Sequence, residues 1–286
     1  MKVQTPEGCG FWKYEKLDKI NNLLIRVIMK KIVIIAAMVF TAFLYAQEPA
    51  CCSKTAEGDI CADASKLMKA VAEKGQKLQS FSSNIMYSLT EDPDIFETTT
   101  VYTGTFRYLK TEKRQYAMID FTTRQEDELP QEKYQQRYIF DGVWLTRIDY
   151  QLKQVNRDQV AAEDKPEDVF KLISKDFPLI GFSGVDTLSG CYEIAIAAQA
   201  QGDKGVCRLT LTPKEKPDSE VKYSDIQFGI DSGTLLPKSI RAVSAADNSI
   251  CNIELDGAAV DTKIDEKLFE LTIPEGFTES VNKLAQ

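Results

Sequence analysis

The sequence predicts a mainly β fold with a helical lid, in which a single strongly curved antiparallel sheet forms an unclosed β-barrel. Two observations lead to this prediction. Short segments in which apolar and polar residues alternate recur between residues 83 and 255, separated by turn residues. An N-terminal amphipathic helix precedes them, and a short internal helix interrupts them. Because two helices are too few to cover both faces of the sheet, we expect them to cover the inside of its bend.

The predicted amphipathic helix spans residues 64–81 and follows a polar linker at 47–62. Asp63 precedes the helix and is a suitable N-cap, because its carboxylate can accept from the free amides of the first turn. The apolar residues recur at helical spacing, with lysines opposite. They are Ala64, Leu67, Met68, Val71, Gly75, Leu78 and Phe81.

From Ser83 the apolar period changes from 3.6 to 2, which predicts strands. Asp141-Gly142 is the strongest hairpin signal, because this pair readily adopts the backbone angles of a two-residue turn. A short helix is predicted at 166–173, and an apolar loop follows at 177–182. We expect roughly ten antiparallel strands. They lie at 85–89, 98–109 and 114–123, in three short pieces of 134–160, and at 191–198, 206–212, 221–230, 236–243 and 249–255.

Residues 29–46 have the pattern of a secretory signal peptide. Two lysines are followed by thirteen mostly apolar residues and then by Ala46, a small residue suited to cleavage. A membrane-spanning helix needs about 20 residues, so a cleaved export signal is favoured over a membrane anchor. Met29 directly precedes the lysines, and we therefore interpret residues 1–28 as an upstream extension or a mis-called start.

The chain is acidic and contains no histidine, with 35 Lys and Arg against 43 Asp and Glu. An acidic balance without a basic patch argues against nucleic acid as a partner. The lack of histidine removes Ser-His and Cys-His pairs and most catalytic zinc sites. We therefore expect no enzyme, no cofactor and no metal site. An enzyme using carboxylates is the less favoured alternative, with Asp120, Asp141 and Asp149 near predicted turns.

Six cysteines follow the predicted signal peptide, and an even number in an exported chain suggests disulfides. They are Cys51, Cys52, Cys61, Cys191, Cys207 and Cys251. Six cysteines allow 15 pairings, and we expect one cross-strand pair among the last three. The first three lack both a Cys-x-x-Cys pair and a histidine, so disulfides or free thiols are favoured over a metal site.

Several motifs, taken in order, resemble one known family over about residues 64–277. After the helix come Gly-Thr-Phe-Arg-Tyr-Leu-Lys at 104–110, Phe-Asp-Gly-Val-Trp-Leu at 140–145, Asp-Tyr-Gln-Leu-Lys-Gln-Val at 149–155, Phe-Pro-Leu-Ile at 177–180 and Leu-Phe-Glu-Leu-Thr-Ile-Pro-Glu-Gly-Phe at 268–277. In this order they are similar to the outer-membrane lipoprotein carrier family, LolA, and its lipoprotein-sorting relatives. The resemblance implies a LolA-like carrier domain at 63–286.

The resemblance also implies a function. In that family, helices cover an unclosed barrel whose apolar interior holds the acyl chains of a lipoprotein crossing the periplasm. Each CH₂ group exposed to water costs about 0.8 kcal/mol, so an acylated protein does not cross water unaided. The chain is then expected to be a monomeric periplasmic carrier of lipoprotein or a related lipid. Its partners would be an inner-membrane release machinery and an outer-membrane acceptor.

Residues expected on the inside of the barrel are both core and candidate lipid contacts. They are Leu67, Val71, Leu78, Phe81, Tyr102, Phe106, Tyr116, Met118 and Trp144. The family often has Arg-Pro just after its Gly-x-Phe strand, whereas this chain has Lys110-Thr111 with Arg114 nearby. The charge is kept and the proline is lost, so Lys110 and Arg114 are candidates for cargo hand-off or simply solvated turn cations.

A different class of function fits the same fold. The alternative is an envelope-stress or regulatory module that binds a partner protein or senses mislocalised lipoprotein. A carrier is expected to co-purify with lipid, which distinguishes the two.

Overall fold

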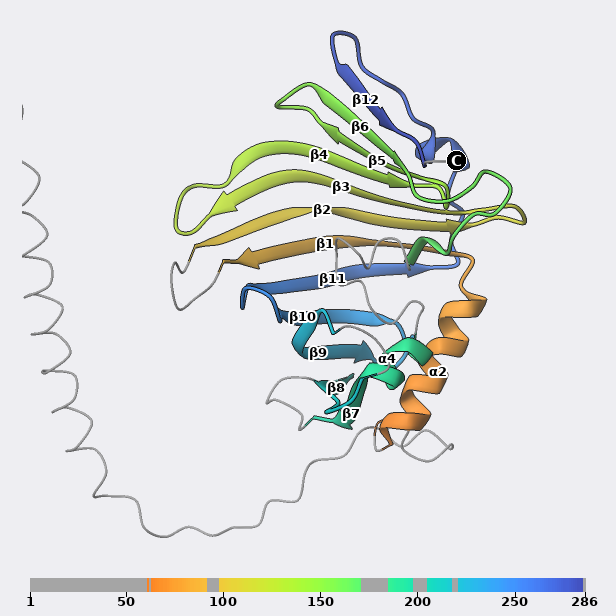
Figure 1. Cartoon of the computed structure of the whole chain (residues 1–286), viewed down its shortest axis with the longest axis vertical. Helices are drawn as coiled ribbons and strands as arrows, with labels where there is room; N and C mark the ends of the chain where they lie inside the picture. The colour runs from red at the N-terminus through yellow and green to blue at the C-terminus, as the bar shows by residue number, and fades with distance from the viewer. Residues whose placement is uncertain are drawn as a thin grey trace, which may run out of the picture. The chain divides into compact units, whose positions relative to one another are not determined.

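One twelve-stranded sheet contains nearly all the regular structure of the described chain (Figure 1). The computed structural model describes residues 61, 63–91, 98–170, 185–197, 205–217 and 221–284, which belong to one unit, Cys51–Gln286. The predicted signal peptide and all of the predicted linker apart from Cys61 lie outside these residues. None of the helices within the described ranges is long and apolar enough to cross a membrane.

The strand order is β12-β6-β5-β4-β3-β2-β1-β11-β10-β9-β8-β7, and β12 and β7 form two open edges. The sheet is therefore unclosed, as predicted. Its strands are β1 (Ser80–Thr90), β2 (Thr99–Lys110), β3 (Gln115–Glu126), β4 (Glu132–Phe140), β5 (Trp144–Asp149), β6 (Gln154–Gln159), β7 (Tyr192–Ile196), β8 (Val206–Pro213), β9 (Tyr223–Asp231), β10 (Pro237–Ser244), β11 (Ile250–Val260) and β12 (Thr278–Asn282).

Most of the sheet follows the sequence in antiparallel hairpins, including the predicted turn at Asp141-Gly142 between β4 and β5. Gly142 has φ +83°, in the left-handed region that glycine adopts freely. Two departures from chain order shape the sheet. Strand β1 pairs with β11, which joins the two runs of hairpins in the middle of the sheet.

The second departure is β12, which pairs with β6 in parallel. The sequence predicted neither this strand nor any parallel pairing, because the five residues of β12 are polar or exposed and show no alternation with burial. The segment before β12 contains the 3₁₀ helix η2 (Glu266–Phe269).

The amphipathic helix α2 (Ala64–Lys77) begins as predicted, with the Asp63 carboxylate accepting from the amide of Lys66 at 3.1 Å. It ends earlier than predicted, because the chain turns at Leu78 and Phe81 already lies in β1. A second helix, α4 (Val185–Cys191), precedes β7. Of the helix predicted at 166–173, Val169 and Phe170 are helical, and the rest of it beyond Phe170, like the loop 177–182, lies outside the described residues.

The two faces of the sheet carry separate apolar clusters. The inner face is defined here by Phe81, Phe106 and Phe228, which share one buried cluster with Leu67 and Val71 of α2. The outer face carries a smaller cluster over β3 to β6, which the C-terminal segment covers through Phe269. Its strand residues are Met118, Ile139, Ile148 and Val155.

One disulfide connects the start of the described chain to the sheet. Cys61 is bonded to Cys207 in β8, with the two Cα atoms 5.5 Å apart. Cys191 and Cys251 are buried and form no disulfide with each other or with Cys207, so the predicted cross-strand pair among the last three cysteines is wrong. The reason is topological: β9 and β10 separate the strands of Cys207 and Cys251. Cys51 and Cys52 lie outside the described residues.

Candidate functional site

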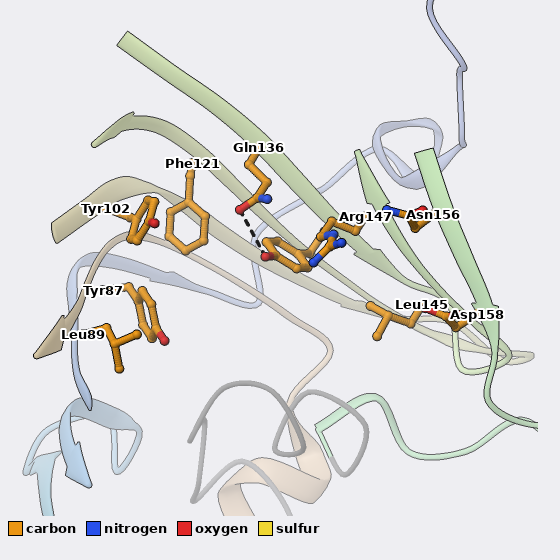
Figure 2. Close-up of a pocket in the computed structure, with 10 residues that line it drawn as sticks. Tyr87, Leu89, Tyr102, Phe121, Gln136, Leu145, Arg147, Asn156 and Asp158 are labelled. Atoms are coloured by element: carbon orange, nitrogen blue, oxygen red, sulfur yellow. Dashed lines mark hydrogen bonds between the residues drawn. The ribbon is translucent and has the colours of Figure 1, made fainter. Parts of the chain in front are cut away.

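A cavity of about 480 Å³ lies on the inner face, over strands β1 to β6 (Figure 2). Its volume is within the usual range for a ligand site. Six of its lining residues are aromatic or aliphatic and four carry amide or charged groups. They are Tyr87, Leu89, Tyr102, Phe121, Tyr138 and Leu145, and then Gln136, Arg147, Asn156 and Asp158.

The aromatic part of the cavity is a continuous patch across four strands. The ring of Tyr102 lies 5.4 Å from that of Phe121 and 6.0 Å from that of Tyr87, measured between centroids. Phe121 continues the patch to Tyr138 of β4, at 6.3 Å. Cross-strand register explains this grouping, because Tyr87 pairs with Tyr102 and both point to the inner face.

The polar part lies on β4, β5 and β6. Arg147 pairs in register with Tyr138 on one side and with Asn156 on the other, so the three side chains share the inner face. The Tyr138 hydroxyl donates to Oε1 of Gln136 at 3.1 Å. Figure 2 shows the two parts separated, with Tyr87, Leu89, Tyr102 and Phe121 at one end and Asn156 and Asp158 at the other.

Burial changes the acidity of groups at the aromatic end. It raises the pKa of Tyr87, with the nearby Cys251 as a smaller cause, and it raises the pKa of the Cys251 thiol itself to about 12. The pKa of Tyr134, whose ring is 5.5 Å from that of Tyr102, is raised to about 12, mainly by burial. Burial thus favours the neutral form of all three groups, so this end of the cavity stays uncharged even in mildly alkaline solution.

Comparison with known proteins gives structural matches only. No protein-family model and no curated protein matches the chain. A LolA superfamily protein from Nitrosomonas europaea matches with 14% identity and a TM-score of 0.28, over 71% of this chain and 97% of that one. LolA superfamily structures are thus among its matches.

Two other structures have higher TM-scores. An uncharacterised conserved protein from Thermus thermophilus matches with 7% identity and a TM-score of 0.46, over 77% of this chain and 100% of that one. The structure of the Pseudomonas aeruginosa MucA/MucB complex matches with 13% identity and a TM-score of 0.43, over 74% of this chain. The match covers 62% of that chain, which is less than two thirds. All three TM-scores are below 0.5, so function has to be argued from the inner face itself.

The structure divides the nine predicted lipid contacts into three groups. Tyr102 alone among them lines the inner-face cavity. The second group is fully buried between α2 and the inner face, namely Leu67, Val71, Leu78, Phe81 and Phe106. These five side chains belong to the buried core and do not line the cavity.

The third group, Tyr116, Met118 and Trp144, lies on the outer face, which corrects their expected position inside the barrel. Met118 belongs to the outer cluster, and the Tyr116 ring is 5.5 Å from that of Phe269. Alternation along a strand shows which residues share a face but not which face is inside. These three were therefore assigned to the wrong side.

Trp144 and Arg114 line a second cavity of about 570 Å³, which lies on the outer face beneath the C-terminal segment. Its two arginines, Arg114 and Arg157, form ion pairs with glutamates outside its lining. Arg114 contacts the Glu163 carboxylate at 2.9 Å, and the Trp144 indole N–H donates to the same carboxylate at 3.0 Å. Arg157 lies 4.8 Å from the centroid of the Trp144 ring and contacts Glu279 at 3.3 Å.

The two hand-off candidates have structural partners. The Lys110 ammonium donates to the backbone carbonyl of Gln76, in the last turn of α2, at 3.1 Å. This bond ties the end of β2 to the helix, where a cation is favoured by the helix dipole. Arg114 belongs to the outer-face network just described, so the two cations lie in different surroundings. Their hand-off role stays a prediction.

The three carboxylates of the alternative enzyme hypothesis also have structural partners. Asp120 pairs with Arg137 at 2.8 Å. Asp141 accepts from the backbone amides of Val143 and Trp144, and Asp149 accepts from the amides that follow it in its turn. Each carboxylate thus stabilises a turn or a strand pair.

Sequence reasoning missed most of the cavity lining. Tyr87 and Leu89 were recognised as alternating strand residues but not as a binding surface. Phe121, Tyr138 and Arg147 belong to segments that were correctly predicted as strands. The missing information was the register between strands, because the wall is formed by residues that are neighbours only across the sheet.

Proposed function

We propose that this protein carries acyl chains, those of a lipoprotein or a related lipid, on the inner face of its sheet. The aromatic cavity over β1 to β4 is the observation that carries this proposal. A lipid chain in this cavity is removed from water and contacts Tyr87, Tyr102 and Phe121. At about 0.8 kcal/mol per buried CH₂, even half of a sixteen-carbon chain gains roughly 6 kcal/mol of transfer free energy.

The contrast with the outer face supports this choice of site. The outer cavity is covered by the protein's own C-terminal segment, and Tyr116, Glu266 and Phe269 connect the two. The aromatic patch on the inner face makes no comparable contact with that segment within the described residues. We therefore assign lipid to the inner face only.

A carrier of this kind would act in the periplasm, between a membrane machinery that releases the cargo and an outer-membrane acceptor. The export signal predicted at residues 29–46 supports this location. The proposed cycle requires no bond to be made or broken in the cargo. It requires only that the cavity bind acyl chains more tightly than water solvates them and less tightly than the acceptor membrane.

Native mass spectrometry tests the proposal directly. The full sequence is expressed in a bacterial host and the protein is purified from the periplasmic fraction, without detergent. We expect adducts with the mass of a lipid or an acylated polypeptide, and organic extraction should remove them. Protein that carries no such adduct and binds no added lipid would contradict the proposal.

A partner-binding module remains a second candidate because the sheet has open edges. Among the described strands, β7 pairs only with β8 and β12 only with β6, so each edge has backbone groups able to accept another strand. The same mass spectra distinguish the candidates. A bound polypeptide without an acyl group would favour the module over the carrier.

A further inference from the structure

Arg147 is the arginine that lines the inner-face cavity. It lies on β5, lines the cavity and is exposed. No hydrogen bond, ion pair or ring contact joins it to any residue in the described part of the chain. Its position places a fixed positive charge beside the aromatic patch, since Tyr138 is its cross-strand neighbour.

The other arginines of the described residues all have partners. Arg137 and Arg241 pair with aspartates, at 2.8 and 3.2 Å. Arg114, Arg124 and Arg157 pair with glutamates. Arg107 donates to a threonine hydroxyl, and Arg208 also has an interaction partner. Arg147 differs from them in lining the inner-face cavity without such a partner among the described residues.

The side-chain amides of Gln136 and Asn156, on the two strands that flank β5, also have N–H groups without a partner among the described residues. Gln136 accepts from Tyr138 through its oxygen, but its NH₂ group donates to no described residue. Asn156 is the cross-strand neighbour of Arg147 on β6, and its side chain likewise has no partner among the described residues. Three donor groups thus line the polar part of the cavity, from Gln136 beside Phe121 to Asn156 on β6, and acceptor oxygens of a ligand can satisfy them.

The cavity also contains one carboxylate, and its position is compatible with an anion near Arg147. Asp158 accepts from the side-chain amide of Asn282 in β12 at 2.7 Å. It is in register with Leu145, two residues from Arg147 on β5, and it forms no ion pair with that arginine. The charge of Asp158 is therefore partly stabilised by β12 and leaves the guanidinium without a counterion.

We propose that the cavity takes a ligand with an anionic head, a carboxylate or a phosphate, whose oxygens bind Arg147, Gln136 and Asn156 while its acyl chain lies across the aromatic patch. This inference rests on the proposed function and specifies its ligand. The strand order places Arg147 on β5 and Tyr87 on β1, four strand spacings apart, which is a distance of at least roughly 19 Å. A long single chain can extend over that distance.

A competition assay with three sixteen-carbon amphiphiles tests the proposal. Palmitate carries a carboxylate, hexadecyl phosphate a phosphate, and hexadecanol a neutral hydroxyl. Each displaces a fluorescent neutral lipid from the full-length protein. We expect the two anions to bind roughly five- to tenfold more tightly than the alcohol, and added salt to reduce this preference.

The variant Arg147→Gln should bind all three amphiphiles about as tightly as the wild type binds hexadecanol. Arg241→Gln is the matched control, because it removes the same charge from the outer face and should keep the preference for anions. Comparison of palmitate with hexadecyl phosphate then tells which anion the site prefers.

The outcomes separate this inference from the proposed function. Equal binding of all three amphiphiles by the wild type, or a preference that survives in Arg147→Gln, would overturn the anionic-head proposal and leave the carrier proposal standing. Failure of all three amphiphiles to bind would overturn both.

Discussion

Gly104 shows how a single residue positions the binding face. It lies at the register shift between β2 and β3, opposite Phe121, and in the motif that carried the family resemblance. A Cβ atom added here would lie 2.0 Å from the backbone oxygen of Asp120 and 2.8 Å from the Cα atom of Phe121. Both contacts are with backbone, which has little freedom to move. Glycine therefore allows β3 to approach closely enough to present Phe121 to the cavity.

Gly104→Ala should lower the free energy of unfolding by about 2–3 kcal/mol, because the added methyl group forces the two strands apart. Urea unfolding followed by circular dichroism measures the effect. Gly233→Ala is the control, since its Cβ would meet only the Asp231 carboxylate, at 3.4 Å, and should change stability far less. Equal effects of the two substitutions would refute the close-approach explanation.

The buried thiol of Cys251 makes the free energy of unfolding depend on pH. Burial raises the pKa of its thiol from an ordinary value near 9 to about 12. The folded protein therefore keeps the proton that the unfolded chain loses, and the stability due to this group is complete below pH 9 and falls as the pH rises toward 12.

Between pH 8 and 10, the wild type should lose about 1–1.5 kcal/mol more stability than Cys251→Ala, which has no thiol to ionise. Urea midpoints at several pH values measure the two slopes, and the lower starting stability of the variant does not affect the comparison. Parallel profiles would show that Cys251 does not titrate as described.

At the scale of elements, alternation and capping residues predicted β2, the β4–β5 hairpin and the start of α2. The end of α2 was predicted too late because Leu78 and Phe81 continue the helical spacing of apolar residues. The structure places Phe81 in β1, paired with Tyr108. Apolar side chains at those positions reach the same buried cluster from either conformation, so the pattern alone does not distinguish them.

The packing of the C-terminal segment was the feature least well predicted from the sequence. Its apolar residues were interpreted as part of a closing segment, whereas Phe269 is 4% exposed on the outer face and Leu268 beside it is 47% exposed. The order Leu-Phe within one motif gives no indication of which side chain is buried.

Phe269→Ala should destabilise the protein by about 3 kcal/mol, because it leaves the outer cluster with a cavity and exposes Met118 and Ile139. Leu268→Ala should change stability by less than about 0.5 kcal/mol. Thermal unfolding of the two variants provides the comparison. A larger effect at Leu268 would mean that the segment packs with its other side.

At the scale of the whole molecule, the two faces of the sheet differ in how the described chain covers them. The outer cluster is covered by η2 and by residues between η2 and β12, such as Leu271 and Phe277, whereas the described chain leaves a cavity on the inner face between the aromatic patch and Arg147. The sequence predicted the unclosed sheet but only one residue of the cavity, Tyr102. The remaining lining depends on register across β1 to β6, which a single sequence does not encode in any local pattern.

Tyr102→Glu should reduce the lipid that co-purifies with the protein by at least about tenfold, because a carboxylate at the centre of the aromatic patch opposes burial of an acyl chain. Lipid phosphorus and fatty-acid content per mole of protein measure the change. Thr122→Glu adds the same charge to an exposed site on the outer face and should leave the lipid content unchanged. Loss of lipid from both variants would point to net charge instead of the cavity.

The pairing of β1 with β11 has a consequence for how the molecule forms. Ile85 is in register with Leu255, 170 residues later, while each half of the sheet on either side grows by local hairpins. Contacts between such distant segments form slowly, because a long loop must be closed before they stabilise anything. The halves can therefore collapse early, but the continuous sheet is completed only when both partners of this central pair are present. Until that closing step, β1 and β11 each have an unpaired edge that can accept another strand.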